Sequence, residues 1–340
     1  MVVSEKIAQV LKDMGISLPQ PPPQVVRVPA KPKPPKQSAP SAVGQTDQAN
    51  QTDANKTVHL ALVNPTEPVD YVEPKWAKFL FHVWDDMEDT PAVMIAGPRG
   101  TGKTLAAMVY AARKGVPLLI CNCNQEMTPE SLLGCPRIDL KGVGGDYLQM
   151  GPFALAAKLD AVVLLDEVNY FPPATQAVAN PLLDTIQGGV FLPYTGERIN
   201  WPNPKVLMTY NDGYSGTREM NQALCDRCEP LVADYLAPAE ERALIVNRTG
   251  CATDLADRAV KTANAIRAAA RGDNGSVMPL DFDLSPRALL SFARRVVQGV
   301  QTESEAWREA VIGRVGGGAR KQGARETVRQ LSMQIGGFQL

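Results

Sequence analysis

The sequence GPRGTGKT at residues 97–104 stands between a short apolar run, AVMIA at 92–96, and a stretch of helical periodicity at 105–114. It matches the pattern GxxxxGK(S/T), in which glycines let backbone N–H groups close around phosphate oxygens and the next helix adds positive potential at its N-terminus. A match arises by chance in about one chain in a hundred of this length. We therefore predict a phosphate-binding loop, rather than an incidental glycine-rich turn, in which Lys103 reaches the β and γ phosphates and the Thr104 hydroxyl holds Mg²⁺. The predicted nucleotide-binding positions in the loop are Gly97, Pro98, Arg99, Gly100, Thr101, Gly102, Lys103 and Thr104.

A pair of adjacent carboxylates ends the next strong apolar run, AVVLLDE at 161–167. Unpaired charges beside a core are costly, so a buried strand rarely ends in two acids without a cation or a catalytic duty. We predict that Asp166 binds the Mg²⁺ that bridges the phosphates and that Glu167 polarises an attacking water as general base. Two carboxylates in a solvated loop are the alternative. A nucleotide kinase would not need the second acid and the NKxD guanine signature is absent, so ATP hydrolysis is favoured.

Three further polar residues are candidates for the same reaction. Asn211 follows an apolar strand pattern at 205–210 and could orient water or touch the γ phosphate. Arg227 follows a short helical run, and its guanidinium suits the spread charge of a phosphoryl transition state. Arg287 begins a later helical pattern and could also reach the nucleotide. Each signal is weak alone, since an isolated arginine more often forms a surface ion pair.

Short apolar runs alternate with helical patterns from about residue 59 to residue 235, which predicts an α/β fold with a mostly parallel sheet flanked by helices. After residue 236 only helical patterns remain, which predicts a small all-helical lid. The expected strands are 92–96, 117–121, 161–165 and 205–210. The expected helices are 105–114, 174–185, 239–246, 255–270 and 286–297, together with a stripe formed by Trp76, Phe79, Leu80 and Val83.

The composition divides the chain into five parts. Residues 1–18 have the spacing of a short amphipathic helix, and 19–58 form a proline-rich, low-complexity linker that we expect to be disordered. The α/β core follows at 59–235 and the helical lid at 236–312. Residues 313–340 hold five basic residues against Glu326 and are predicted to form a basic tail, either solvated or in contact with a partner or nucleic acid.

Charge and cysteine content exclude several classes of protein. Lys and Arg total 35 against 36 Asp and Glu, so no global field draws the chain to nucleic acid or anionic lipid. No apolar run approaches the roughly 20 residues of a membrane span, and no secretory signal is visible. Six cysteines are too few for a disulfide scaffold. The chain has only two histidines, and the closely spaced thiols lack the other half of a zinc site. We expect a cytoplasmic protein that does not act on membranes.

The order of four motifs carries a family resemblance: GPRGTGKT, LLDEVN, TYNDGYSGTREMNQALCDRC and LSPRALLSF. Together they resemble the MoxR-type, dynein-related branch of the AAA+ ATPases. The third motif is similar to the ATPase subunits that activate nitric oxide reductase and rubisco and to that of cobaltochelatase. The resemblance implies an AAA+ core of P-loop NTPase type, with Walker A at 97–104, Walker B at Asp166 and Glu167, Asn211 as sensor 1, Arg227 as an arginine finger acting in trans, and Arg287 as sensor 2.

The resemblance also implies a homo-oligomer, a hexameric ring that remodels a protein client, often alongside a protein with a von Willebrand A domain. Two inserted hairpins, matched here by 136–151 and 188–204, would line a pore or contact substrate, with Tyr147 as the aromatic of interest. Two departures bear on Arg227: Asp212 replaces the usual proline after the sensor asparagine, and Cys228 replaces the usual aromatic after the finger arginine.

These features favour an ATP-hydrolysing ring ATPase that uses ATP and Mg²⁺ to remodel or activate a partner protein. Two other classes remain open. One is a nucleotide-gated assembly module with little turnover. The other is a nucleic-acid-dependent motor that uses the basic tail, which ranks last because no basic stripe with interleaved aromatic residues is present.

Overall fold

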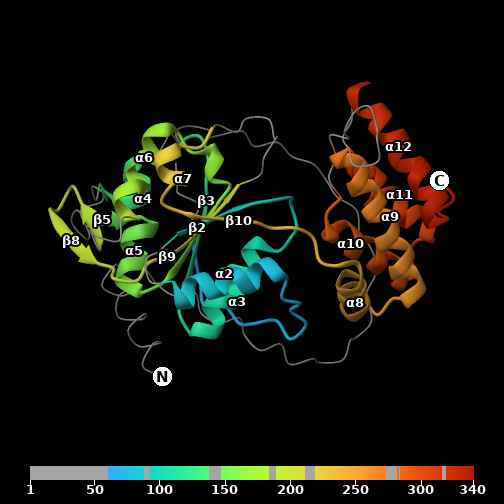
Figure 1. The fold of residues 1–340 in the computed structure, drawn as a ribbon, viewed down its shortest axis with the longest axis horizontal. Helices are drawn as coiled ribbons and strands as arrows, with labels where there is room; N and C mark the ends of the chain where they lie inside the picture. The colour runs from blue at the N-terminus through green and yellow to red at the C-terminus, as the bar shows by residue number, and fades with distance from the viewer. Residues whose placement is uncertain are drawn as a thin grey trace, which may run out of the picture. The chain divides into compact units, whose positions relative to one another are not determined.

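The structure of the protein is a computed structural model (Figure 1). A six-stranded sheet lies at the centre of its N-terminal α/β part, with strands between Leu60 and Val232. The structure describes residues 60–87, 92–137, 147–183, 189–210, 219–272, 282, 284–315 and 319–340. The described residues belong to one compact unit, His59–Leu340. The predicted N-terminal helix and proline-rich linker lie outside the described residues, as does Asn211.

The sheet has the strand order β1-β3-β6-β9-β2-β10. Strand β1 is antiparallel to β3, and the other neighbours are parallel, which confirms the predicted α/β class. The strands β1 and β10 were not predicted, since each has only four residues and β10 contains Pro230. The strands are β1 (Leu60–Val63), β2 (Ala92–Ala96), β3 (Leu118–Asn122), β6 (Val162–Asp166), β9 (Lys205–Tyr210) and β10 (Glu229–Val232).

Helices α2 and α3 build a hydrophobic core with the sheet, in which Trp76, Leu80 and Trp84 of α2 pack with Val109 and Tyr110 of α3. The predicted stripe on α2 is wrong at Phe79, which is 40% exposed, because the helix turns Ala77 and Phe81 inward instead. The helices of this part are α2 (Lys75–Asp86), α3 (Lys103–Lys114), α4 (Pro129–Leu133), α5 (Pro152–Leu159), η1 (Val168–Tyr170), α6 (Pro173–Leu182) and α7 (Gln222–Cys225).

The parallel strands bring their carboxyl ends to one edge of the sheet. Ala96 at the end of β2 pairs with Tyr210 at the end of β9, and Asp166 at the end of β6 pairs with Asn122 of β3. Ligands of open α/β sheets bind at this edge, outside the carboxyl ends of the strands. The loop after β2 and the two acids after β6 therefore meet at the same place, although they are far apart in the sequence.

Two small antiparallel strand pairs occupy the regions predicted as hairpins. Strand β4 (Gly134–Arg137) pairs with β5 (Tyr147–Met150), and the backbone of Tyr147 lies opposite that of Arg137. Strand β7 (Gly189–Leu192) pairs with β8 (Glu197–Asn200). This second pair exposes two aromatic side chains, Phe191 at 52% and Tyr194 at 53%.

The second part of the structure is all-helical, as predicted (Figure 1). Its core is apolar and includes an aromatic cluster, in which the ring of Phe292 meets that of Trp307 edge-on at 5.0 Å. Its helices are α8 (Pro238–Thr249), α9 (Thr253–Arg271), α10 (Pro286–Val297), α11 (Glu303–Ala310), η2 (Ile312–Arg314) and α12 (Ala319–Gly336).

The predicted basic tail is wrong, because α12 and the residues after it belong to the helical domain. Ala324, Val328 and Ser332 are buried at helical spacing, and the ring of Phe338 stacks on Trp307 with centroids 4.2 Å apart. The basic residues that suggested a tail include Arg325 and Arg329, which lie on the exposed face of the same helix. The prediction of a tail relied on the number of basic residues, which describes only the exposed face of α12 and not its buried face.

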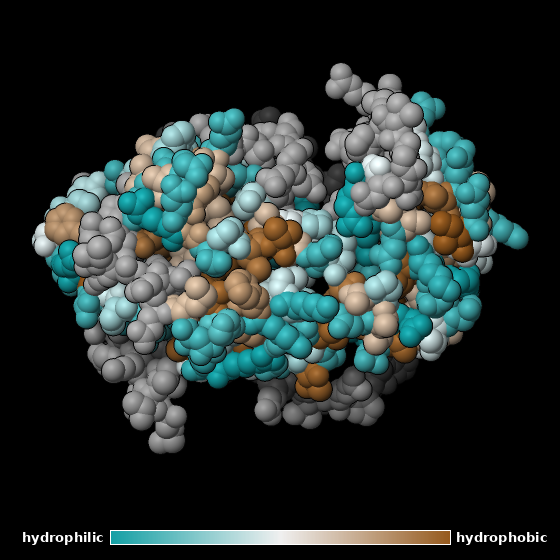
Figure 2. Space-filling model, in the orientation of Figure 1, coloured by the Kyte–Doolittle hydropathy of each residue, from teal (hydrophilic) through white to brown (hydrophobic). Residues whose placement is uncertain are grey.

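The surface in view is mostly hydrophilic, with apolar residues in small groups between the polar ones (Figure 2). No helix within the described ranges is long and apolar enough to cross a membrane.

Candidate nucleotide-binding site

The loop between β2 and α3 is built on glycines in left-handed or otherwise unusual backbone conformations. Gly97 has φ +144° and Gly100 has φ +82°. A Cβ atom on Gly97 would lie 2.2 Å from the Ala233 carbonyl oxygen, and one on Gly100 would lie 2.8 Å from the Ser285 Cβ. Both positions therefore require glycine. The loop is packed on one side against the segment after β10 and on the other against the start of α10.

Lys103, the first residue of α3, is 8% exposed and folds back toward its own loop. Its Nζ donates to the carbonyl oxygens of Gly97 at 2.6 Å and Pro98 at 3.2 Å. The Thr101 hydroxyl also donates to the Pro98 carbonyl, at 3.1 Å. The ammonium group is therefore held inside the loop that the sequence predicts to bind phosphate.

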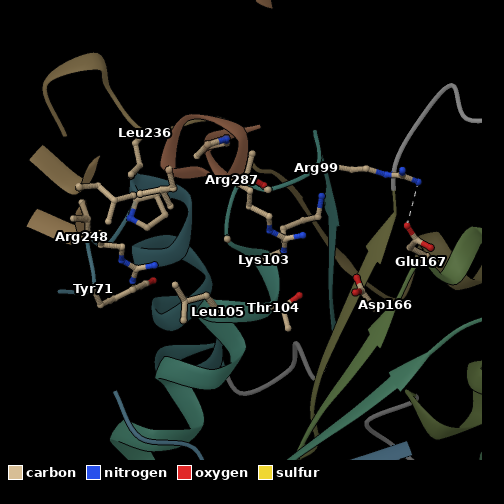
Figure 3. Close-up of a pocket in the computed structure, with 18 residues that line it drawn as sticks. Tyr71, Arg99, Lys103, Thr104, Leu105, Asp166, Glu167, Leu236, Arg248 and Arg287 are labelled. Carbon is tan, nitrogen blue, oxygen red and sulfur yellow. Dashed lines mark hydrogen bonds and ion pairs between the residues drawn. The ribbon is translucent and has the colours of Figure 1, made fainter. Parts of the chain in front are cut away.

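Thr209 fixes the two acids that end β6. This buried residue of β9 donates its hydroxyl to Asp166 Oδ1 and accepts the backbone N–H of Glu167 at 3.1 Å. Glu167 has φ +62°, a left-handed conformation that is uncommon outside glycine and that often marks functional sites. The two adjacent acids are thereby held in different orientations, Asp166 toward Thr104 and Glu167 toward Arg99 (Figure 3).

Arg99, predicted only as a loop position, reaches the second acid. Its Nη2 lies 3.5 Å from Glu167 Oε1, and the two side chains are 54% and 37% exposed. At that length and exposure the ion pair contributes at most about 1 kcal/mol to stability. The contact therefore matters for where the Glu167 carboxylate lies, and little for the fold.

A cavity of about 480 Å³ joins the loop, the acids and the helical domain (Figure 3). One end is polar and holds Lys103, Thr104, Asp166 and Glu167. The other end is mainly apolar, and its lining comes from residues before α2 and from the helical domain. Those residues are Tyr71, Val72, Pro74, Leu236, Leu244 and Leu290.

Residues 65–74 are held over the apolar end by two arginines. Arg113 of α3 binds Glu67 at 2.7 Å and Glu73 at 2.5 Å, and its guanidinium lies 5.9 Å from the centre of the Tyr71 ring. Burial raises the pKa of the Tyr71 hydroxyl far above its usual range. On the other side, Arg248 of α8 pairs with Asp70.

The hydrogen bond from Arg248 lowers the pKa of Asp70 below its usual value. Since Arg248 belongs to the helical domain, this ion pair connects residues 65–74 directly to the lid. Residues from both parts of the structure therefore meet beside the cavity.

The predicted arginines separate in space. Arg287, the second residue of α10, is exposed and lines the cavity near Lys103. Arg227 is absent from the described lining; it is exposed after α7, and its Nη1 donates to the Ala223 carbonyl at 2.7 Å. Burial raises the pKa of the neighbouring Cys228 to about 12, so this thiol is a packed side chain and not a reactive one.

Sequence reasoning missed three parts of the site. Thr209 is one, although a threonine inside an apolar strand beside the acid-bearing strand was a usable signal. The others are residues 65–74 and the lining leucines Leu236, Leu244 and Leu290, none of which was predicted to line the site. Lys103, Thr104, Asp166, Glu167 and Arg287 were all predicted, and the structure brings them to one cavity.

Two family models match the chain in succession. Residues 92–228 match the AAA domain of the dynein-related subfamily, which covers the loop, the acids and Arg227. Residues 241–332 match the CbbQ/NirQ/NorQ C-terminal domain, which covers the helical part up to α12.

Two curated relatives are similar to part of the chain. The denitrification regulatory protein NirQ of Pseudomonas aeruginosa is 30% identical over 221 residues, 64% of this chain and 81% of NirQ. An uncharacterised protein of Staphylococcus aureus is 34% identical over 147 residues, 42% of this chain and 56% of that protein. A solved structure of a putative ATPase from Cytophaga hutchinsonii aligns with a TM-score of 0.39 and 16% identity, covering 76% of this chain and 79% of that one. From its two family matches and its likeness to NirQ, the chain belongs to the MoxR-type family of AAA+ ATPases, in the CbbQ/NirQ/NorQ group.

Proposed function

We propose that this chain binds ATP with Mg²⁺ in the cavity and hydrolyses it. The observation that carries the proposal is the convergence of Lys103, Thr104, Asp166 and Glu167 at one end of a single cavity. The glycine loop suits a triphosphate, because its glycines at positive φ, at the N-terminal end of α3, let backbone N–H groups turn toward phosphate oxygens. The size of the cavity lies within the range of small-molecule sites, about 300–1,000 Å³.

The oxygen donors at the polar end suit magnesium. Thr104 and Asp166 would hold the ion through a hydroxyl and a carboxylate, the hard ligands that Mg²⁺ prefers. When bound, Mg²⁺ supplies positive charge that offsets the phosphate oxygens. Lys103 adds a second positive charge from inside the loop, and Thr209 keeps Asp166 in place by its hydroxyl hydrogen bond.

Glu167 is the proposed general base. Its backbone is fixed by Thr209 and by the left-handed turn, so its carboxylate is directed away from Asp166; in this role the carboxylate would accept a proton from water. The apolar end of the cavity, with Val72, Leu236 and Leu290, would hold the adenine ring of ATP. Arg287 would contact the phosphates from the lid side.

The substitution Glu167→Gln tests whether Glu167 is the general base. The variant should bind ATP but lose turnover by about 10²-fold or more, the usual contribution of a general base. Glu326→Gln, the same change on the exposed face of α12, is the matched control and should hydrolyse ATP at the parent rate. Phosphate release and nucleotide binding are measured on the same samples. Hydrolysis by Glu167→Gln at the parent rate would show that the base is wrongly assigned.

We also propose that hydrolysis requires assembly, with Arg227 acting on the nucleotide of a neighbouring copy in a ring, which the family resemblance implies is hexameric. The position of Arg227, exposed and outside the lining of its own cavity, supports this role. A mixture of Glu167→Gln subunits, which keep Arg227, with Arg227→Ala subunits, which keep the base, should recover turnover that neither has alone. No recovery would contradict a shared site.

The proposed work of the ring is to remodel or activate a protein partner, which the family resemblance implies often involves a von Willebrand A domain protein. The exposed aromatics Phe191 and Tyr194 support the β7–β8 pair as a contact with that client. Replacing both with serine should leave basal turnover unchanged and remove stimulation by the client. The client is obtained by capture on the ATP-trapped Glu167→Gln ring.

A second candidate, nucleotide-gated assembly with little turnover, is favoured by one contact. Arg99 pairs with the carboxylate that would activate water, which would slow hydrolysis while the pair persists. Steady-state phosphate release separates the two functions, because a gated module turns over fewer than one ATP per assembly cycle. Stimulation by DNA or RNA that strengthens at low salt would instead indicate a nucleic-acid motor.

A further inference from the structure

Gln176 is a buried polar residue of α6 that connects two functional segments. It is 1% exposed. Its Nε2 donates to the Phe171 carbonyl at 3.2 Å, and its Oε1 accepts the backbone N–H of Asn221 at 2.7 Å. Burial of a side-chain amide is costly unless its hydrogen bonds are satisfied, and here both ends of the amide bind backbone groups from outside α6.

On one side the amide holds the loop that follows the candidate base. Glu167 is the N-cap of the short helix η1, and the N–H of Tyr170 donates to the Glu167 carbonyl at 3.0 Å. Phe171 ends it by donating its N–H to the Val168 carbonyl, also at 3.0 Å. The carbonyl that Gln176 binds is thus one turn of chain away from Glu167.

On the other side the amide holds the start of α7. Asn221 caps this helix, because its Oδ1 accepts the N–H groups of Ala223 at 2.9 Å and Leu224 at 3.3 Å. A helix of four residues has no stability of its own. Its position depends on its anchors, which are the Gln176 bond to Asn221 and the buried side chains of Leu224 and Cys228.

Arg227 comes two residues after the end of this helix and is hydrogen-bonded to it. Its guanidinium donates to the Ala223 carbonyl at 2.7 Å, within the turn that Asn221 caps. A shift of α7 would therefore move the guanidinium with it. Misplacing a catalytic group by about 1 Å can cost about 10²-fold in rate.

We infer that Gln176 is a positioning residue for the arginine that each copy presents to its neighbour. The inference rests on the proposed function, in which Arg227 acts in trans. Gln176 is not among the described residues that line the cavity; its amide connects α7 to the segment after Glu167. Removing the amide leaves the Phe171 carbonyl and the Asn221 N–H without this partner. The buried side chains of Leu224 and Cys228 alone then hold α7.

The test places one substitution in either of two subunits. The donor subunit carries Glu167→Gln and supplies only Arg227; the acceptor carries Arg227→Ala and supplies only a working site. Gln176→Met, which keeps the size of the side chain and removes the amide, is added to one or the other before mixing. Turnover of the mixture then shows whether Gln176 is needed in the subunit that supplies Arg227 or in the subunit that supplies the working site.

The expected result is asymmetric. Gln176→Met in the donor should lower turnover of the mixture by about tenfold or more, whereas in the acceptor it should change turnover by less than about threefold. Gln298→Met, the same change at an exposed residue of the helical domain, should have no effect in either subunit. Equal losses in donor and acceptor, or a larger loss in the acceptor, would overturn the inference.

Two further measurements keep the outcomes distinct. If the parent mixture shows no recovered turnover, the proposed shared site fails, and that result is separate from any effect of Gln176. If Gln176→Met does not fold by circular dichroism, Asn221→Ala takes its place, because it removes the cap of α7 and leaves the buried amide unchanged. It should lower turnover only in the donor, and a symmetric loss would again overturn the inference.

Discussion

Two arginine–glutamate pairs, one in each half of the protein, use the same chemistry in opposite settings. In the α/β core, Arg99 and Glu167 are 3.5 Å apart and 54% and 37% exposed. In the helical domain, Arg267 and Glu241 are 2% and 0% exposed, and the guanidinium donates to both carboxylate oxygens at 2.7 and 2.8 Å. The first pair can separate when a ligand arrives, and the second cannot separate without unfolding.

The surroundings of the buried pair explain the difference. Arg267 also donates Nε to the Leu284 carbonyl at 2.8 Å and lies 3.8 Å from the centre of the Tyr235 ring. Tyr235 belongs to the segment that joins β10 to α8. The helical domain therefore uses its buried charge to hold its own helices and the connection to the core, whereas the core leaves its charges at the strand ends for chemistry.

The largest expected effect is on the buried pair. Arg267→Met leaves Glu241 as an unpaired buried carboxylate and should lower the free energy of unfolding by about 3–5 kcal/mol. Arg271→Met is the matched control one turn later, where the exposed pair with Asp234 is 3.8 Å long; its cost should be under about 1 kcal/mol. Urea midpoints measured by circular dichroism compare the two. Similar midpoints would remove the contrast between the pairs.

The aromatic cluster of the helical domain gives the next effect. Phe338→Ala removes a ring that is 2% exposed and stacked on Trp307, and it should cost about 3 kcal/mol or more. Ile335→Ala, at a residue of α12 that is 42% exposed, should cost much less. Thermal unfolding followed by tryptophan fluorescence measures both. A small loss for Phe338→Ala would mean that the C-terminal residues do not complete the core.

A smaller effect is expected at the ion pair between residues 65–74 and the lid. The pKa of Asp70 is lowered in the folded state, chiefly by the hydrogen bond from Arg248. A carboxylate with a lowered folded pKa contributes stability above its unfolded value, and this contribution is lost as the pH falls through the folded value. Asp70→Asn should therefore cost up to about 1 kcal/mol at neutral pH.

The pH dependence provides the check on that pair. The difference between parent and Asp70→Asn should be constant from neutral pH down to about pH 5, and should shrink as the pH falls through and below the usual pKa of 3.8. Urea midpoints across this range measure it. A difference that grew toward low pH would show the opposite sign and contradict the assignment.

The smallest effect is expected at the exposed pair in the core. A double-mutant cycle of Arg99→Ala and Glu167→Ala should give a coupling free energy below about 0.5 kcal/mol, because both side chains are solvated. The cycle of Arg267 and Glu241 on the same scale should give at least several times more. A strong coupling between Arg99 and Glu167 would mean that the core also depends on its charge pairs for stability.

Much of the candidate site could be predicted because its signals are local. The glycine pattern and Lys103 specify a tight loop before a helix, and Asp166 with Glu167 marks the end of a buried strand. Parallel strands then bring these ends together by geometry alone. Thr209 was missed because its role is a contact with residues more than forty positions away, and a threonine in an apolar strand does not by itself identify its partners.

The two arginines after the acids show the same limit. Without the family resemblance, the residues around Arg227 and Arg287 look alike in the sequence, since each is a single arginine beside a short helical pattern. The tertiary structure places Arg287 on the cavity and Arg227 outside its described lining. The buried connection from Gln176 to Asn221 is likewise invisible in the sequence, where an isolated glutamine in a helix is an ordinary solvent-facing residue.

The sequence alone determined the α/β class of the core, four of its six sheet strands and the chemistry at the strand ends, because the periodicity and the glycine loop depend only on neighbouring residues. The tertiary structure decided whether each charged side chain is buried or exposed. The buried Arg267, the exposed Arg99 and the packed helix α12 differ in which distant side chains surround them, which sets the solvation of each group and therefore its role.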